Sequence, residues 1–253
     1  MIFDLFKPKK KEVVQERKFY FPADFIDIHS HILPGIDDGA RSTEHSLELL
    51  GKMYKLGIRN FVCTPHVIEG MWENSTEKIL HTYEQLKSEV EKHEILKDIH
   101  IRVAAEYMMD DHFIQLLENR DLLAVKDEKI LVEMSYLAPP ANLFEVIAEI
   151  QVKGFTPILA HPERYSSYHE DLGVYEQLKS AGCLFQLNMI SLTNYYGKEV
   201  HEAALWLLRN KMIDFTGSDL HHMRHMGVIK SLTRREDMME LLQPVILNNE
   251  KLK

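Results

Sequence analysis

Short apolar segments alternate with longer amphipathic segments along most of the chain. Seven runs have the length and the apolar, β-branched composition of buried strands: Phe25–Ile28, Ile58–Cys63, Ile99–Ala104, Ile130–Val132, Thr156–Leu159, Cys183–Leu187 and Met212–Phe215. The segments between them space their apolar residues three or four positions apart, which is typical of helices that pack on a sheet. The alternation predicts parallel strands joined by helices, and seven such units favour a closed or nearly closed barrel.

Capping residues mark the ends of the expected helices. Ser42 can cap one helix, and Asn74 with Glu77 resembles a capping box at the start of the next. Pro139 and Pro140 can begin a third helix, because proline is favoured in the first helical turn. Glycines end several of these segments: Gly57, Gly154 and Gly182. We therefore expect an α/β fold.

The first 23 residues differ from the rest of the chain. The segment Met1–Lys11 combines apolar residues with a short basic run that is interrupted by Pro8. Apolar residues followed by lysines favour anionic lipid surfaces, whereas chain ends are commonly disordered. We interpret residues 1–23 as a flexible extension, with weak membrane contact as the alternative. Residues 24–253 contain no repeat and no low-complexity linker, so we expect them to form a single domain.

Composition and charge narrow the class of protein. The 253 residues carry a net charge of −9 at pH 7, which argues against nucleic acid as a partner because phosphate backbones require a basic face. No apolar run reaches the length of about 18 residues needed to cross a bilayer. The two cysteines, Cys63 and Cys183, exclude a disulfide-rich secreted scaffold and favour the cytoplasm.

Polar residues with metal-binding side chains follow almost every predicted strand. In chain order these are Asp27, His29, His31, Asp37, Asp38, His66, Glu106, Glu133, His161, Asp219, His221 and His222, and Asn188 follows the sixth strand. The carboxyl ends of parallel barrel strands meet at one face. Imidazole and carboxylate groups suit Mn²⁺, Fe²⁺ and Zn²⁺, and so many ligands suit two or three ions whose charge relieves the repulsion between the acids.

The other histidines lie within or beside the predicted helices. We interpret them as ordinary surface or core residues: His45, His81, His93, His100, His112, His169, His201 and His225. Arg164, three residues after His161, can offer a forked donor to a phosphate, or it can form an ion pair with Glu163. Arg224, Arg41 and His222 are weaker candidates for contact with a substrate.

Four motifs together resemble the PHP superfamily (polymerase and histidinol phosphatase), and within it the CpsB/CapC type of bacterial protein-tyrosine phosphatase. They read DIHSHILPGIDDG at 27–39, TPH at 64–66, HPERY at 161–165 and SDLH at 218–221. The similarity runs from about Asp24 to the C-terminal helices. It implies a distorted (β/α)7 barrel of the PHP fold with a trinuclear, usually Mn²⁺-dependent, site. Val67 after His66, and the run His221–Arg224, depart from the family pattern.

Carried over position by position, the resemblance implies three sets of ligands. His29, His31, Glu106 and Asp219 would bind one ion, and Glu106 would bridge to a second that is completed by Glu133 and His161. The third ion would take His66, His221 and either Asp37 or Asp38. Arg164 matches the arginine with which the family contacts phosphate. Fe²⁺, Zn²⁺ and Mg²⁺ are alternatives to Mn²⁺.

The expected function is metal-dependent hydrolysis of protein phosphotyrosine. A cysteine-dependent phosphatase needs a C-x5-R loop, but Glu69 and Met189 stand six positions after the two cysteines. Histidinol phosphatase, or another small-molecule phosphatase of the superfamily, remains an alternative because its metal core would look similar. A non-catalytic scaffold would lack ligands, and none is missing. The resemblance implies a bacterial tyrosine kinase of capsule or exopolysaccharide assembly as substrate protein, in the cytoplasm.

Overall fold

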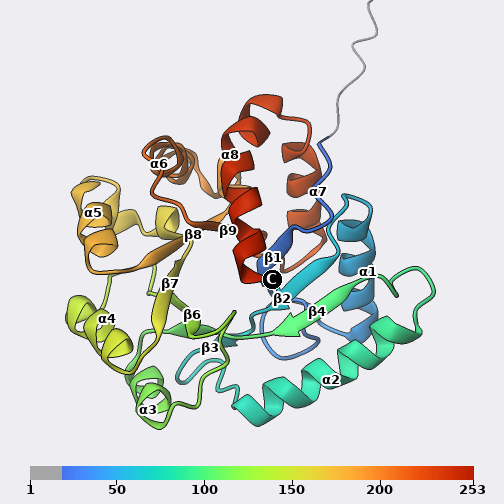
Figure 1. The fold of residues 1–253 in the computed structure, drawn as a ribbon, viewed down its shortest axis with the longest axis horizontal. Coiled ribbons are helices and arrows are strands. Elements are labelled where there is room, and N and C mark those ends of the chain that lie inside the picture. Colours follow the sequence, from blue (N-terminus) through green and yellow to red (C-terminus); the bar gives the residue numbers. More distant parts are fainter. Residues whose placement is uncertain (1–18) are drawn as a thin grey trace, which may run out of the picture.

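The computed structural model describes residues 19–253, and at its centre parallel strands form a curled sheet with helices outside it (Figure 1). The strand segments in this part of the chain are β1 (Ile26–Ser30), β2 (Asn60–Cys63), β3 (His66–Val67), β4 (His100–Val103), β5 (Glu106–Met108), β6 (Lys129–Glu133), β7 (Thr156–Ala160), β8 (Leu184–Asn188) and β9 (Phe215–Gly217). Every strand pair is parallel. The expected α/β architecture is therefore confirmed.

Two kinks divide the sheet into the hydrogen-bonded orders β1-β2-β4 and β3-β5-β6-β7-β8-β9. Two residues, Thr64 and Pro65, separate β2 from β3, and likewise Ala104 and Ala105 separate β4 from β5. Because β2 pairs with β4 and β3 pairs with β5, each pair of segments is one kinked strand. Pro65 has no N–H group to continue the ladder, which accounts for one kink. Seven strands thus follow one another in chain order, as the apolar pattern predicts.

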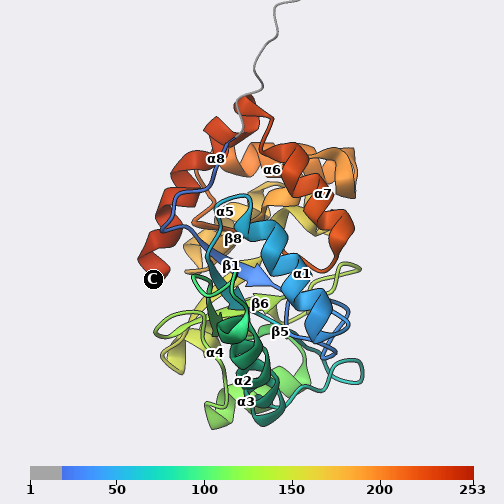
Figure 2. The same cartoon turned by 90° about the vertical axis from the view of Figure 1, so that its right-hand side faces the viewer.

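The helices cover the outside of this sheet. They are α1 (Thr43–Tyr54), α2 (Thr76–Lys92), α3 (Asp111–Asn119), α4 (Leu143–Val152), α5 (Gly173–Ser180), α6 (Lys198–Arg209), α7 (Met223–Leu232) and α8 (Glu236–Asn248). Figure 2 shows α1 and α7 side by side on one flank, and residues of the two helices are in contact. No helix within residues 19–253 combines the length and the apolar character needed to cross a bilayer.

Three of the expected boundaries are wrong. Ser42 does cap α1, but α2 is capped by Ser75, because the Asn74 side chain instead binds the carbonyl groups of Ile36 and His66. Helix α4 begins at Leu143, after both of the prolines that were expected to start it. The last strand is Phe215–Gly217 rather than Met212–Phe215, because it pairs with β8 only from Phe215 onward.

Strands β9 and β1 meet and close the barrel, and a different kind of contact joins them at each end. At the carboxyl end, Asp219 N donates to His29 O at 2.8 Å and His31 N donates to Leu220 O at 3.0 Å. At the other end, the buried side chain of Asn249 bridges the two strands. Its Nδ2 donates to Ile26 O at 2.7 Å and to Thr216 O at 2.6 Å, and its Oδ1 accepts from Thr216 N at 3.0 Å.

Asn249 belongs to a short 3₁₀ helix, Asn249–Leu252, at the C-terminal end of the chain, which lies against β1 in Figure 1. Leu252 is fully buried in the apolar cluster inside the barrel. A larger apolar cluster lies between the sheet and the helices, and it includes Phe21. Residues 19–23 are thus in contact with the domain, whereas residues 1–18 of the expected extension lie outside the described residues.

Candidate metal centre

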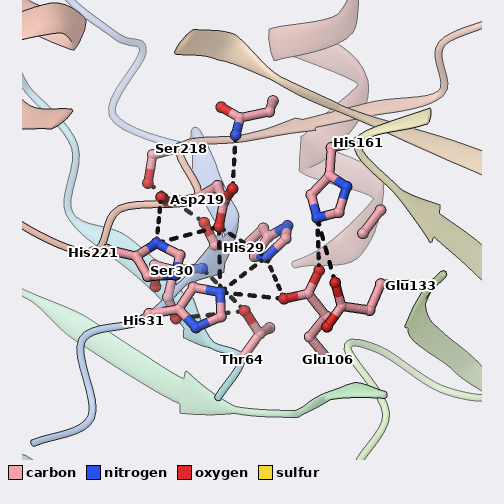
Figure 3. A network of polar contacts seen from close by, with 12 residues as sticks. His29, Ser30, His31, Thr64, Glu106, Glu133, His161, Ser218, Asp219 and His221 are labelled. Atoms are coloured by element: carbon pink, nitrogen blue, oxygen red, sulfur yellow. Dashed lines mark hydrogen bonds and ion pairs between the residues drawn. The ribbon is translucent and has the colours of Figure 1, made fainter. Parts of the chain in front are cut away.

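Histidine and carboxylate side chains converge at the carboxyl end of the barrel (Figure 3). They come from β1, β3, β5 and β6 and from the loops that follow β1, β7 and β9, and eight of them are buried: His29, His31, His66, Glu106, Glu133, His161, Asp219 and His221. In Figure 3 the imidazole rings point toward the carboxylates of Glu106, Glu133 and Asp219. The structure therefore brings together residues up to 192 positions apart, from His29 to His221.

The tautomers of His29 and His31 are fixed by their outer partners. His29 Nδ1 lies 2.7 Å from Gln186 Oε1, and His31 Nδ1 lies 2.8 Å from Asp37 Oδ2. Since both oxygens accept, each Nδ1 carries a hydrogen, and in the neutral ring each Nε2 presents a lone pair. The two Nε2 atoms face each other at 3.1 Å. Two lone pairs in this arrangement repel each other unless a proton or a metal cation lies between them.

The carboxylates of Glu106 and Asp219 each lie close to both of these nitrogen atoms. Glu106 Oε2 lies 3.1 Å from His29 Nε2 and 3.3 Å from His31 Nε2, and Asp219 Oδ1 lies 3.3 Å from both nitrogens. Glu106 Oε2 is buried and has no hydrogen-bond partner among the described residues. A buried carboxylate oxygen without a donor is unfavourable, so this atom fits a bound divalent cation.

Further ligand groups surround this point. His161 Nε2 lies 2.9 Å from Glu106 Oε1 and 4.0 Å from Glu133 Oε2, while Asp38 Oδ1 lies 3.3 Å from His221 Nε2. Within residues 19–253, four groups have ligand atoms that all lie within 4.8 Å of one another: His29, His31 and Asp219; His29, Glu106 and His161; His66, Glu106 and Glu133; and His31, Asp38, His66 and His221. Shared members such as Glu106 make the groups contiguous.

Adjacent Asp37 and Asp38 have different positions. Asp37 Oδ2 accepts from His31 Nδ1 and from the backbone N–H of His66, and Oδ1 accepts from Gly39 N. Burial alone would raise the pKa of Asp37, but His31 lowers it to about 2. Asp37 therefore orients His31 and is a member of no ligand group, whereas Asp38, about half exposed, faces His66 and His221.

The protein alone balances the charges of this cluster poorly. Burial opposes protonation of His66, yet Glu106 and Glu133 raise its pKa to about 9. Burial together with the charge of Glu106 raises the pKa of Glu133. The histidines would have to hold protons to neutralise the carboxylates, and divalent cations can take the place of those protons.

Arg164 lies beside the cluster, and its ion-pair partner is Asp219 rather than Glu163. Its Nη1 donates to Asp219 Oδ2 at 2.9 Å. The guanidinium is stacked between two rings, 4.6 Å from the centroid of Tyr136 and 4.3 Å from that of Tyr196. Glu163 points elsewhere, where its Oε1 accepts from the backbone N–H of Asn188 at 3.0 Å. Arg164 is thus held in one orientation at the edge of the site.

A cleft of about 630 Å³ opens over the cluster. Its floor includes His66, Glu133 and Asp219, and much of its wall is apolar or aromatic: Ile68, Met71, Trp72, Met108, Tyr136, Leu137, Tyr195 and Tyr196. The Trp72 ring stacks on His66, with 5.1 Å between centroids and 17° between planes. The cleft therefore combines a charged floor with walls that suit a flat apolar group.

The weaker candidates for substrate contact occupy different places. His222 lines the cleft and also caps α7, where its Nδ1 accepts from His225 N at 3.3 Å. Arg224 is exposed and lies over Tyr195, and it is not among the residues that line the cleft. Arg41 lines a separate cavity of about 420 Å³ that shares Asp38 and His222 with the cleft.

Sequence reasoning missed His225. It is buried, it lines the cleft, and its Nδ1 lies 3.1 Å from Asp219 O. Burial lowers its pKa to about 4, so the ring is neutral near pH 7. Its position in the first turn of α7, four residues after His221, is the signal that could have revealed it. Gln186, which binds His29, carries no comparable signal, whereas Asn188, which binds Asp219, follows the sixth predicted strand.

Comparison with known protein families shows which family this chain belongs to. The family model described as "Capsular polysaccharide synthesis, CpsB/CapC" matches residues 25–234. The chain belongs to the CpsB/CapC family. Two relatives are the tyrosine-protein phosphatase YwqE of Bacillus subtilis, 32% identical over 79% of this chain and 78% of that protein, and the tyrosine-protein phosphatase CpsB of Streptococcus pneumoniae, 30% identical over 78% and 83%.

A solved structure of the CpsB/CapC family superposes closely on this one. The crystal structures of YwqE and CpsB, described as unique metal-dependent tyrosine phosphatases, include a chain that matches with a TM-score of 0.79 and 30% identity. The match covers 90% of this chain and 93% of that chain. The residues that the family model matches, 25–234, include all the described strands and every residue of the four candidate ligand groups.

Proposed function

We propose that this protein is a metal-dependent phosphatase that hydrolyses phosphotyrosine in proteins. The observation that carries the proposal is the convergence of the His29 and His31 lone pairs with Glu106 and Asp219 at the floor of an aromatic-walled cleft. The CpsB/CapC relatives are named tyrosine-protein phosphatases, and the matching crystal structures are described as metal-dependent. Site chemistry and family membership support the same reaction.

The residues present fit two or three divalent cations. His29, His31, Glu106 and Asp219 would hold one, and Glu106, Glu133 and His161 would hold a second, so that Glu106 belongs to both sets. Asp38, His66 and His221 would hold a third, and of the two adjacent aspartates Asp38 has the position for it. Mixed imidazole and carboxylate donors suit Mn²⁺, which we propose as the metal, with Fe²⁺, Zn²⁺ and Mg²⁺ as the other cations that these groups accept.

The chain's own residues bind and orient the substrate. Bound divalent cations supply charge neutralisation and activation of the attacking water. Arg164, fixed by Tyr136 and Tyr196, has the geometry to donate to two phosphoryl oxygens, where charge lies in the transition state. The aromatic and apolar wall receives the phenyl ring of phosphotyrosine. Phenolate, with a pKa of about 10, leaves with little help from a general acid.

Neither cysteine offers a rival nucleophile. Cys63 and Cys183 are both buried, and both lie in the core rather than in the cleft. Burial raises the pKa of the Cys183 thiol to about 12 and raises that of Cys63 as well. A thiol with a raised pKa is a poor nucleophile near pH 7. Hydrolysis therefore relies on the cluster at the carboxyl end of the barrel.

The biological setting follows from the family. We propose as substrate a phosphotyrosine protein of capsule or exopolysaccharide assembly, specifically a bacterial tyrosine kinase, and a cytoplasmic site of action. The family description, capsular polysaccharide synthesis, supports the pathway. The net charge of −9 makes nucleic acid an unfavourable partner.

The deciding experiment compares kcat/KM for a phosphotyrosine peptide, the same peptide with phosphoserine, and histidinol phosphate, all with Mn²⁺. We expect the phosphotyrosine peptide to be hydrolysed fastest, because only this substrate has both an aryl group for the wall and a phenolate leaving group. Arg164→Ala serves as a control that should reduce hydrolysis of all three. Faster turnover of histidinol phosphate would assign the protein to small-molecule metabolism instead.

A further inference from the structure

Two strongly exposed apolar side chains lie at the mouth of the cleft over the metal cluster. Leu137 is 93% exposed and Met71 is 65% exposed, yet both line the cleft of about 630 Å³. A side chain that is largely exposed and still lines a cavity lies at its opening rather than at its floor. Single exposed apolar residues are common, but a pair that is continuous with a ligand cleft indicates a contact surface. We call Met71 and Leu137 the apolar rim.

The turn between β3 and α2 holds Met71 in place. Ile68 N donates to Trp72 O at 3.1 Å, and Trp72 N donates to Ile68 O at 3.0 Å, so the two ends of the turn are bridged. Glu69 N donates to Asp110 Oδ2 at 2.9 Å, and Asp110 caps α3, which attaches the turn to the domain. Met71 is therefore presented at the opening of the cleft, next to the Trp72 ring in its wall.

The loop after β6 holds Leu137 on a different part of the opening. Leu137 N donates to Ser135 Oγ at 3.2 Å. The preceding residue, Tyr136, lies against the Arg164 guanidinium and also stacks on Tyr165, with 5.9 Å between ring centroids and 28° between planes. The loop thus places an aromatic ring over the arginine and leaves the Leu137 side chain in solvent beside it. Apolar surface kept in water at a cleft is available to a partner.

The charges in the cleft favour apolar rather than acidic neighbours of a phosphotyrosine. None of the described residues that line the cleft is a lysine, and the one arginine among them, Arg164, pairs with Asp219 beside the floor. An acidic residue next to the phosphotyrosine would find no cation of its own at the mouth. It would also face Asp38, a half-exposed carboxylate in the lining. Apolar side chains, by contrast, find Met71 and Leu137.

We infer, on the basis of the proposed phosphotyrosine hydrolysis, that the apolar rim binds apolar side chains that flank the phosphotyrosine in the substrate protein. When the phosphate reaches the floor, the chain on both sides of the phosphotyrosine crosses the mouth of the cleft. Packing of leucine-sized side chains on Met71 and Leu137 then removes apolar surface of both partners from water, which stabilises the complex. The preferred substrates are thus phosphotyrosine sequences with apolar neighbours.

The test compares kcat/KM, with Mn²⁺, for three phosphotyrosine peptides that differ only in the two residues on each side of the phosphotyrosine. These residues are all Leu, all Gln or all Glu. We expect the Leu peptide to exceed the Gln peptide by about tenfold, which is the selectivity that a few buried methylene groups provide, and the Glu peptide to be the slowest.

Two double variants locate the selectivity. Met71→Ser/Leu137→Ser should bring the ratio of Leu to Gln peptide close to one. Ile95→Ser/Val152→Ser is the matched control, because it replaces two comparably exposed apolar residues that do not line the cleft, and it should keep the wild-type ratio. Each ratio is taken within one variant, so a partial loss of active protein cancels. Melting temperatures and metal content verify that both variants fold and bind metal.

The outcomes separate this inference from the proposed function. Equal hydrolysis of the three peptides by the wild-type protein, or a preference for the Glu peptide, would refute the role of the apolar rim and leave phosphotyrosine hydrolysis standing. A wild-type preference for Leu in Met71→Ser/Leu137→Ser would refute it too, because the selectivity would then arise elsewhere. Hydrolysis of histidinol phosphate but of none of the peptides would refute the proposed function, and the inference with it.

Discussion

The two ends of the barrel join the same strands, β1 and β9, with different chemistry. At the amino end, Asn249 donates twice and accepts once, and every polar atom of its side chain has a protein partner. At the carboxyl end, the backbone hydrogen bonds of His29 and His31 close the barrel, but their side chains face Glu106 Oε2, which has no donor. One end is complete as a protein structure, and the other has the ligand groups for the cations that we propose.

This difference separates stability from activity. Buried polar groups that all have partners stabilise a fold, whereas buried groups that lack partners raise its energy and bind whatever satisfies them. We therefore expect changes at the carboxyl end to act mainly on turnover, and changes at the amino end to act mainly on the free energy of unfolding. Five experiments, taken from the largest expected effect to the smallest, examine this contrast.

Metal removal should abolish activity. Dialysis against EDTA would leave the carboxylates of the cluster without countercharge, and hydrolysis of a phosphotyrosine peptide should stop. Mn²⁺ should restore the rate best, and it should also raise the melting temperature, because a ligand that binds only the folded state stabilises it. Full activity in protein that elemental analysis shows to be free of metal would refute the cation requirement.

Substitution of a single residue in the cluster should reduce activity far more than substitution of a histidine outside it. His161→Ala and Asp219→Ala should each lower kcat/KM by about 10³-fold or more, because losing a ligand loses a cation. His169→Ala and His201→Ala are the controls, since each ring contacts only a backbone carbonyl outside the cluster. Similar losses in all four variants would mean that the strand-end position has no special role.

Arg164 should act on the phosphate and leave the cations in place. Arg164→Ala and Arg164→Lys should both raise the barrier by about 2–4 kcal/mol, because lysine cannot copy the forked donor. Kinetics and elemental analysis would be measured on the same samples. A drop in metal content would indicate instead that the ion pair with Asp219, at 2.9 Å, mainly holds that ligand.

Asn249→Ala should destabilise the fold by removing the contacts between β1 and β9 at the amino end of the barrel. It removes three hydrogen bonds and leaves the buried carbonyl groups of Ile26 and Thr216 without a donor, which lowers the free energy of unfolding by about 2–4 kcal/mol. Urea denaturation of the Mn²⁺-loaded protein measures this, and kcat/KM should stay near wild type. Asn248→Ala, which loses a single bond to Asp214 O, is the matched control with a smaller loss. A reversed ranking would refute the bridging role of Asn249.

The cysteines should have the smallest effect. Cys63→Ala and Cys183→Ala should retain wild-type kcat/KM, and iodoacetamide near pH 7 should leave the activity unchanged. Both thiols are buried, and the Cys183 pKa of about 12 keeps that thiol protonated far above neutral pH. Inactivation that depends on one cysteine would bring a thiol nucleophile back into consideration.

The sequence predicts the barrel well because period and spacing determine it. The seven apolar runs and the helical spacing between them are local properties, and so is the position of an acid or histidine after each strand. The positions of Glu106, shortly after β4, and of His161, directly after β7, are therefore predicted correctly by pattern alone. The kinks between β2 and β3 and between β4 and β5 are not predicted, since they depend on how the neighbouring strands pack.

Details of the site that depend on distant contacts are beyond sequence pattern. Nothing local distinguishes Asp37 from Asp38, because the distinction depends on which one reaches His31 across the loop. Likewise, Arg164 prefers Asp219, 55 positions away, to the adjacent Glu163. The bridge made by Asn249 to Ile26 spans 223 positions, and asparagine is too common for its type to be a signal.

The positions of β1 and β9 along the chain also set an order of events on the ribosome. Asp27 and Ser218, whose hydrogen bond joins the two strands, lie 191 positions apart, so translation at about 5–20 residues per second separates them by about 10–40 s. During that interval the H-x-H pair of β1 has been synthesised, but Asp219 has not. A nascent chain therefore lacks part of the proposed ligand set until the segment that contains Asp219 has been synthesised.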